Sequence, residues 1–62
     1  MLYKEDLNNT IKIYILQLNA IQIMLKHIKK CNLFLKEKYN EDKLLNSITD
    51  INNAIKNLEE LT

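Results

Sequence analysis

Apolar side chains recur along the first two thirds of the chain with the spacing of an α-helix. The intervals alternate between four and three residues, which is the repeat of a helix that packs against another helix. Only Asn32 interrupts the repeat. The members of this predicted seam are Leu7, Ile11, Tyr14, Leu18, Ile21, Leu25, Ile28, Leu35 and Tyr39. The pattern predicts one long helix over about residues 3–38.

A second apolar set lies beside the predicted seam and consists of Ile13, Leu16, Ala20, Ile23 and Phe34. At 100° per residue, the combined apolar arc is roughly 160° wide. One partner helix cannot cover an arc of that width, so we expect a second neighbour. Residues 11–15 alternate like a β-strand, but the four-three repeat continues far beyond them and favours a helix.

A second helix is expected over about residues 41–61, after a turn at about residues 39–41. Its apolar stripe consists of Leu44, Ile48, Ile51, Ile55 and Leu58. Asn40 is a good N-cap, and Glu41 and Asp42 place negative charge at the positive end of the helix dipole. Tyr39 and Leu44 stand at the two positions of a hydrophobic staple.

Two alternatives remain open at the ends of the first helix. Thr10 is a second possible N-cap, which would leave the first nine residues frayed. A rival break at residues 29–32, in place of the turn near residue 40, would give two helices of nearly equal length. If the first helix is itself broken, the fold would be a three-helix bundle.

The predicted fold is all-α: a single domain over residues 1–62, built as an antiparallel two-helix hairpin that dimerises into a helical bundle. A turn near residue 40 places Leu44 opposite Lys36 and Ile55 opposite Leu25, so the shorter second helix ends near Leu18. Residues 3–17 would then overhang. We therefore predict a dimer or partner interface formed by Leu7, Ile11, Ile13, Tyr14, Leu16 and Leu18.

Composition strengthens the expectation of a partner. A chain of 62 residues without glycine or proline is small for an independent hydrophobic core, and such chains usually need a disulfide, a metal or association. Cys31 is the single cysteine, and with His27 it supplies at most two of the four ligands of a structural zinc ion. No catalytic, metal or phosphate motif is present, so we expect no enzyme, no cofactor and no metal.

The charge is small overall but unevenly distributed. The net charge is +1, with seven lysines and three acids in residues 1–40 and two lysines and five acids in residues 41–62. On a helical wheel a lysine ridge lies opposite the predicted seam, formed by Lys12, Lys26, Lys29, Lys36 and Lys38. It is either a solvated face or a set of phosphate contacts for RNA.

The favoured function is a small regulatory protein-interaction module, such as an inhibitor, adaptor or antitoxin-like protein of phage or plasmid origin. Its expected partners are a second copy of itself or a host protein. The alternative is a dimeric helical-hairpin RNA-binding protein that uses the lysine ridge. No membrane span or signal-peptide pattern is present, so we expect a cytoplasmic protein that is complete from Met1.

Overall fold

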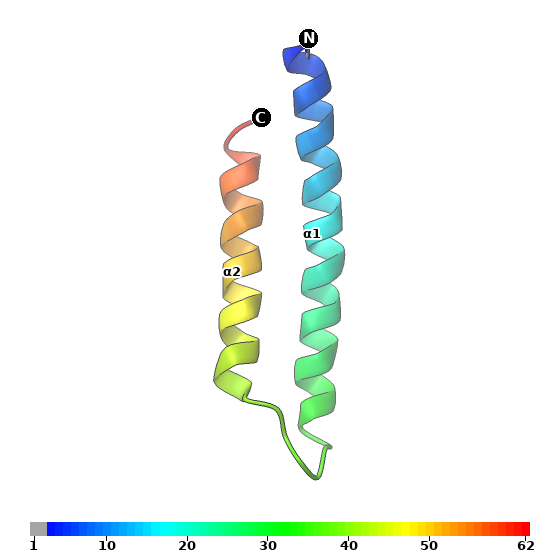
Figure 1. Ribbon diagram of the computed structural model, residues 1–62, viewed down its shortest axis with the longest axis vertical. Helices are drawn as coiled ribbons and strands as arrows, with labels where there is room; N and C mark the ends of the chain where they lie inside the picture. The colour runs from blue at the N-terminus through cyan, green and yellow to red at the C-terminus, as the bar shows by residue number, and fades with distance from the viewer. Residues whose placement is uncertain (1–2) are drawn as a thin grey trace.

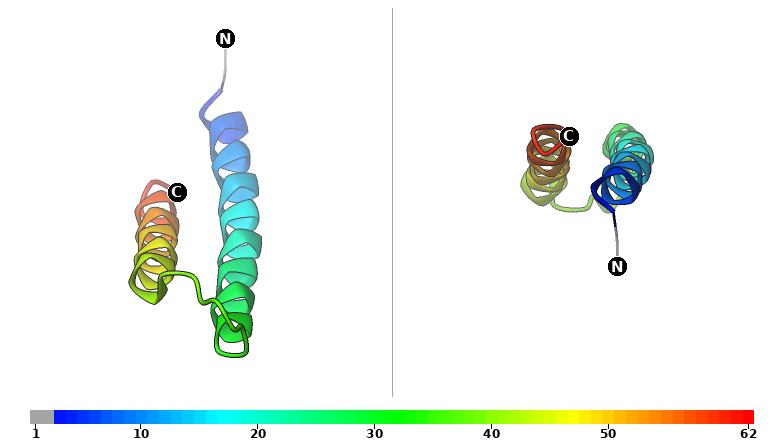
Figure 2. Two further views of the ribbon diagram at one scale, coloured as in Figure 1. Left: turned by 60° about the horizontal axis from the view of Figure 1, so that its bottom comes forward. Right: turned by 90° about the horizontal axis from the view of Figure 1, so that it is seen from above.

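The computed structural model describes residues 3–62, which form two antiparallel helices, α1 (Lys4–Asn32) and α2 (Glu41–Glu59), joined by residues 33–40 (Figure 1). The predicted all-α hairpin is confirmed, and residues 3–62 contain no strand. Residues 1 and 2 of the predicted 1–62 domain, Met1 among them, lie outside the described residues. The hairpin is long and thin, with extents of 52 × 15 × 14 Å, and Figure 2 shows it as a single layer of two helices.

α1 is one unbroken helix of 29 residues, so the three-helix alternative is wrong. Tyr3 is its N-cap but makes no side-chain capping bond. The start is instead favoured by Glu5 and Asp6, whose negative charges lie at the positive end of the helix dipole. The alternative N-cap, Thr10, lies inside the helix, where its hydroxyl donates to the carbonyl of Asp6 at 3.0 Å.

α1 ends at Asn32, six residues before the predicted end at residue 38 and at the rival break of residues 29–32. Asn32 is only 3% exposed. Its side-chain amide donates to the carbonyl of Tyr39 at 3.1 Å, and its side-chain oxygen accepts from the backbone N–H of Tyr39 at 2.7 Å. This pair of bonds, which we call the Asn32 clamp, holds the far end of the connection against the last turn of α1, and the chain leaves the helix there.

α2 begins at Glu41, as predicted. The side chain of Asn40 accepts a hydrogen bond from the backbone N–H of Lys43 at 3.1 Å, which confirms Asn40 as the N-cap. Glu41 and Asp42 lie in the first turn. α2 ends at Glu59, two residues before the predicted end, and its buried or half-buried residues are Leu44, Ile48, Ile51, Ala54, Ile55 and Leu58.

The register between the helices differs from the prediction. The side chain of Gln22 donates to that of Asn52, whereas the predicted register places Asn52 near Ile28. α2 therefore reaches about six residues further along α1 than expected. The reason is the early end of α1: the chain turns back sooner, and Glu41 lines the same hollow as Leu33.

The predicted overhang is consequently shorter, and α1 extends past α2 by only a few turns (Figure 1). The core is small. Among residues 3–62, the buried apolar side chains are Ile48 and Ile55 alone.

Candidate functional site

α1 carries two parallel rows of side chains with heptad spacing, and the first row faces α2. We call this row the covered seam. Each of its members is buried or half-buried: Asn8, Ile11, Ile15, Leu18, Gln22, Leu25, Lys29 and Asn32. Two of the polar members have partners: Gln22 donates to the side chain of Asn52, and Asn32 bonds to Tyr39. Half of the row is nevertheless polar, which is unusual for the side of a helix that faces its neighbour.

The second row is the first row moved back by one residue, so it lies about 100° further round α1. We call it the open seam. All of its members are exposed: Leu7, Thr10, Tyr14, Gln17, Ile21, Met24, Ile28 and Cys31. None is charged. Tyr14 and Met24, for example, are 52% and 57% exposed, although both are large side chains.

The two seams are therefore inverted relative to a self-sufficient hairpin. The hairpin buries the row with four polar residues and leaves in solvent the row with five large apolar residues. Monomeric proteins rarely expose large continuous apolar patches, and those that exist commonly mark interaction sites. The open seam is the candidate functional site of this chain.

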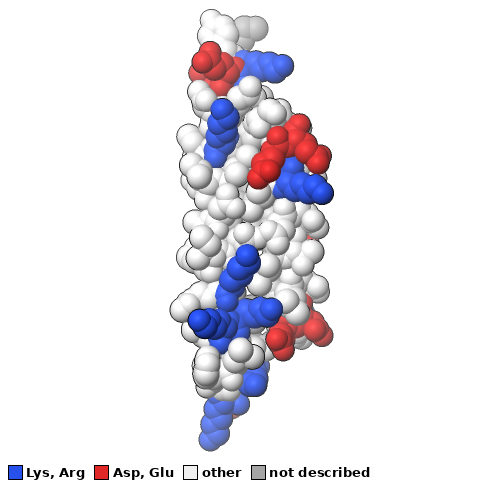
Figure 3. Space-filling model, turned by 180° about the vertical axis from the view of Figure 1, so that it is seen from behind, with Lys and Arg blue, Asp and Glu red and all other residues white. Residues whose placement is uncertain are grey.

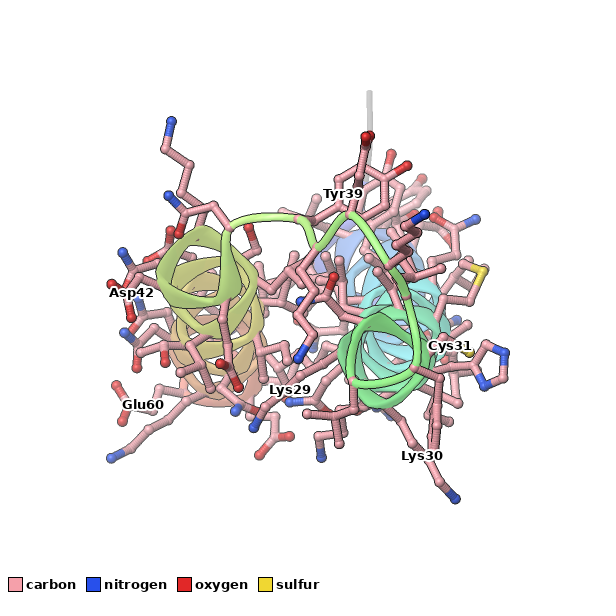
Figure 4. All side chains as sticks on the ribbon, turned by 90° about the horizontal axis from the view of Figure 1, so that it is seen from below. Lys29, Lys30, Cys31, Tyr39, Asp42 and Glu60 are labelled. Carbon is pink, nitrogen blue, oxygen red and sulfur yellow. The ribbon has the colours of Figure 1, made fainter. Side chains whose placement is uncertain are left out.

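The open seam runs into a hollow at the closed end of the hairpin. Ile28 lines this hollow with residues from the connection and the start of α2: Tyr39, Asn40, Lys43, Leu44 and Ser47. Tyr39 and Lys29 project on opposite sides of the hairpin (Figure 4). The lower end of the open seam is therefore turned toward the face of the hairpin that carries Tyr39.

The six residues of the predicted interface do not form one surface. Leu7 and Tyr14 belong to the open seam, and Ile13 lies next to it on the outer side of α1. Ile11 and Leu18 are half-buried against α2, because α2 extends further than predicted. Leu16 is 68% exposed but points away from the open seam, about 150° round the helix.

The sequence prediction assigned two apolar residues of the site to the wrong neighbour and missed a third. Ile21 and Ile28 belong to the predicted seam, which was expected to face the second helix, and Met24 was not included. α2 instead packs to one side of that seam. It half-buries Ile11, Leu18 and Leu25, whereas Leu7, Tyr14, Ile21 and Ile28 stay exposed. The sequence feature that indicates a second surface on α1 is the width of the apolar arc, which requires two neighbours.

The lysine ridge is not continuous in the structure. Lys36 and Lys38 lie in the connection, so the helical wheel does not apply to them. Lys29 is half-buried toward α2, which leaves Lys12 and Lys26 exposed on α1. Lys26, Lys29 and Lys30 line a hollow together with Glu41, and basic and acidic side chains share this face of the hairpin (Figure 3).

Two reactive side chains of α1, Cys31 and His27, lie close together. The Cys31 sulfur lies 3.5 Å from Nε2 of His27, one turn earlier, and both residues are exposed. Cys31 projects away from α2 (Figure 4). Within residues 3–62, no three His, Cys, Asp or Glu side chains are grouped as a metal site would require.

Neither α1 nor α2 has the length and apolar content of a membrane-crossing helix. The chain matches no protein-family model, and no curated protein or solved structure is significantly similar to it.

Proposed function

We propose that this protein is a small regulatory protein-interaction module that binds an α-helical protein surface through the open seam of α1. The observation that carries the proposal is the inversion of the two seams, which leaves the more apolar row in solvent. Burial of a large apolar side chain contributes about 1.5–3 kcal/mol. Five such side chains in a straight row provide enough free energy for specific association with a second helix.

The chemistry of the open seam defines the kind of partner. Residues at heptad spacing pack into the spaces between the side chains of another helix. Because the seam has no charge, the matching surface is an apolar helical stripe rather than an acidic peptide or a nucleic-acid backbone. A target protein that binds this seam through such a stripe fits this description. Binding would regulate the target, as an inhibitor or an adaptor does.

Photo-crosslinking tests the proposal directly. Tyr14 is replaced with the photoreactive residue benzoylphenylalanine, which keeps an aromatic ring at the centre of the open seam. We expect irradiation to link position 14 to a protein, whether a second copy or a different chain. The same replacement at Leu16 is the matched control, because Leu16 is two residues away, more exposed, and on the other side of α1.

Two results would contradict the proposal. One is the absence of any protein crosslink at position 14 in purified protein and in cells that express it. The other is equal crosslinking at positions 14 and 16, which would indicate contact without a preferred face.

A further inference from the structure

The solvent-exposed area of the chain is larger than that of a compact monomer of the same mass. Its solvent-accessible surface is 5383 Å², whereas a compact monomer of 7.4 kDa exposes about 4200 Å². The excess of about 1200 Å² exceeds the roughly 800 Å² that each partner contributes to a standard stable interface. One additional chain of similar size is sufficient to cover it.

Resting on the function proposed above, we infer that the occupant of the open seam is a second copy of this chain, with the two α1 helices antiparallel. Reversed about its centre, the seam meets itself in register, with Ile28 opposite Thr10 and Ile21 opposite Gln17 in two of the four kinds of layer. Leu7 then lies opposite Cys31 of the second copy, and Tyr14 lies opposite Met24 of the second copy. Each layer pairs a residue from one heptad position with a residue from the other, as in antiparallel coiled coils.

The charges at the ends of α1 favour this direction. The first turn of α1 carries Lys4, Glu5 and Asp6, with a net charge of −1, and the last turn carries Lys29 and Lys30. The antiparallel arrangement brings the acidic end of one helix to within about a turn of the basic end of the other. A parallel arrangement places like charges side by side and aligns the two helix dipoles, which is unfavourable.

The angle between the two seams determines how the four helices of the dimer are arranged. The covered seam and the open seam are about 100° apart on α1. A two-fold axis across the open seam therefore places both α2 helices on the same side of the α1 pair. The result is a four-helix bundle, in which each α1 contacts its own α2 through one seam and the second α1 through the other. The half-buried Ala54 leaves room for the two α2 helices to approach.

Disulfide formation in a glutathione redox buffer distinguishes the two directions. Reversal about the seam centre separates the two native Cys31 residues by about 36 Å along the helices, far beyond the 4.4–6.8 Å between Cα atoms that a disulfide allows. We expect wild-type protein to form little linked dimer. The Leu7→Cys variant should form linked dimer in high yield, with position 7 joined to Cys31 of the other copy.

Two variants serve as controls for the disulfide. The double variant Leu7→Cys with Cys31→Ser should form no linked dimer, and Leu16→Cys, on the other side of α1, should behave like wild type. Efficient linkage of Cys31 to Cys31 in wild-type protein would overturn the antiparallel arrangement.

Sedimentation equilibrium measures the association itself. The variant Tyr14→Gln with Ile21→Gln should raise the dimer dissociation constant at least about 100-fold, since it removes four buried side chains from the dimer. The control Leu16→Gln with Ile23→Gln removes two apolar residues that are more exposed, from the other side of α1, and should change the constant less than about threefold. Circular dichroism of each variant establishes that the helices persist.

The result that overturns this inference differs from the result that overturns the proposed function. A wild-type protein that stays monomeric at high micromolar concentration excludes the second copy. If position 14 still crosslinks to another protein, the binding function stands with a different occupant. If position 14 crosslinks to no protein, both proposals fall.

Discussion

At the scale of single residues, Asn32 ties the connection to the end of α1. A large share of helices end on a residue with positive φ, usually glycine. This chain has no glycine, and no residue of 3–62 has positive φ. The carbonyls of Lys30, Cys31 and Asn32 instead accept 3₁₀-type bonds from the backbone N–H groups of the next three residues. The Asn32 clamp provides partners for both backbone groups of Tyr39.

We expect Asn32→Ala to lower the free energy of unfolding by about 1–3 kcal/mol, because both backbone groups of Tyr39 lose their partner. Urea unfolding at a fixed protein concentration measures the loss. Asn19→Ala is the matched control, since Asn19 is an exposed asparagine in the same helix. Equal stability of the two variants would show that the clamp contributes nothing.

The N-cap of α2 is a second residue-scale feature with a measurable effect. Asn40→Ala should lower the free energy of unfolding by about 0.5–2 kcal/mol, whereas Asn40→Asp should retain the capping bond. Asn46→Ala on the exposed side of α2 is the control and should be neutral or slightly stabilising, because alanine has the higher helix propensity. A loss as large for Asn46→Ala as for Asn40→Ala would contradict a specific capping role.

At the scale of elements, the start of α2 was predictable because its signals are local. Asn40, Glu41 and Asp42 act within one turn of each other, so their roles follow from the sequence alone. The end of α1 was predictable only as the rival break at residues 29–32, which has no local cap, because it depends on a bond between residues seven positions apart. In the sequence, Asn32 looks like a defect in an apolar seam, and only the folded connection reveals Tyr39 as its partner.

The candidate site was predictable in part for a similar reason. The width of the apolar arc on α1 indicates two neighbours, and that inference agrees with the two seams. Which residues face which neighbour depends on the position of α2 around α1. Because α2 packs to one side of the predicted seam, Leu18 is half-buried while Tyr14 and Ile21 stay exposed.

Amide hydrogen exchange tests the end of α1 and the clamp together. The backbone N–H groups of residues 36–38 donate to no backbone acceptor within the described chain, so they should exchange rapidly. The Tyr39 N–H should be protected in wild-type protein and lose its protection in Asn32→Ala. Slow exchange at residues 36–38 would instead support the longer helix that the sequence predicts.

At the scale of the whole molecule, the distribution of charge separates protein binding from RNA binding. Lysines and acids share one face (Figure 3), and exposed charges contribute little to association between proteins. We expect the triple variant Lys12→Gln, Lys26→Gln and Lys36→Gln to leave sedimentation behaviour unchanged. Fluorescence anisotropy with labelled RNA should detect only weak binding at physiological salt.

The RNA alternative predicts the opposite outcome for the same variant. Binding to RNA would be tight at physiological salt, and the slope of log K against log salt would fall by roughly 0.7–0.9 for each phosphate contact that is lost. That result would make the lysine ridge, rather than the open seam, the functional surface.

The last prediction concerns the coupling of folding to association. A hairpin whose buried apolar side chains are Ile48 and Ile55 has little free energy to offset chain entropy. If the second copy supplies the missing burial, mass action requires the thermal midpoint to rise with protein concentration. We expect circular dichroism melts over a hundredfold range of concentration to show this rise for wild type and for the Leu16→Gln, Ile23→Gln control. The rise should vanish in Tyr14→Gln with Ile21→Gln, whose midpoint should be lower than that of wild type and independent of concentration. A wild-type midpoint that is independent of concentration would mean that the two helices fold without a second copy.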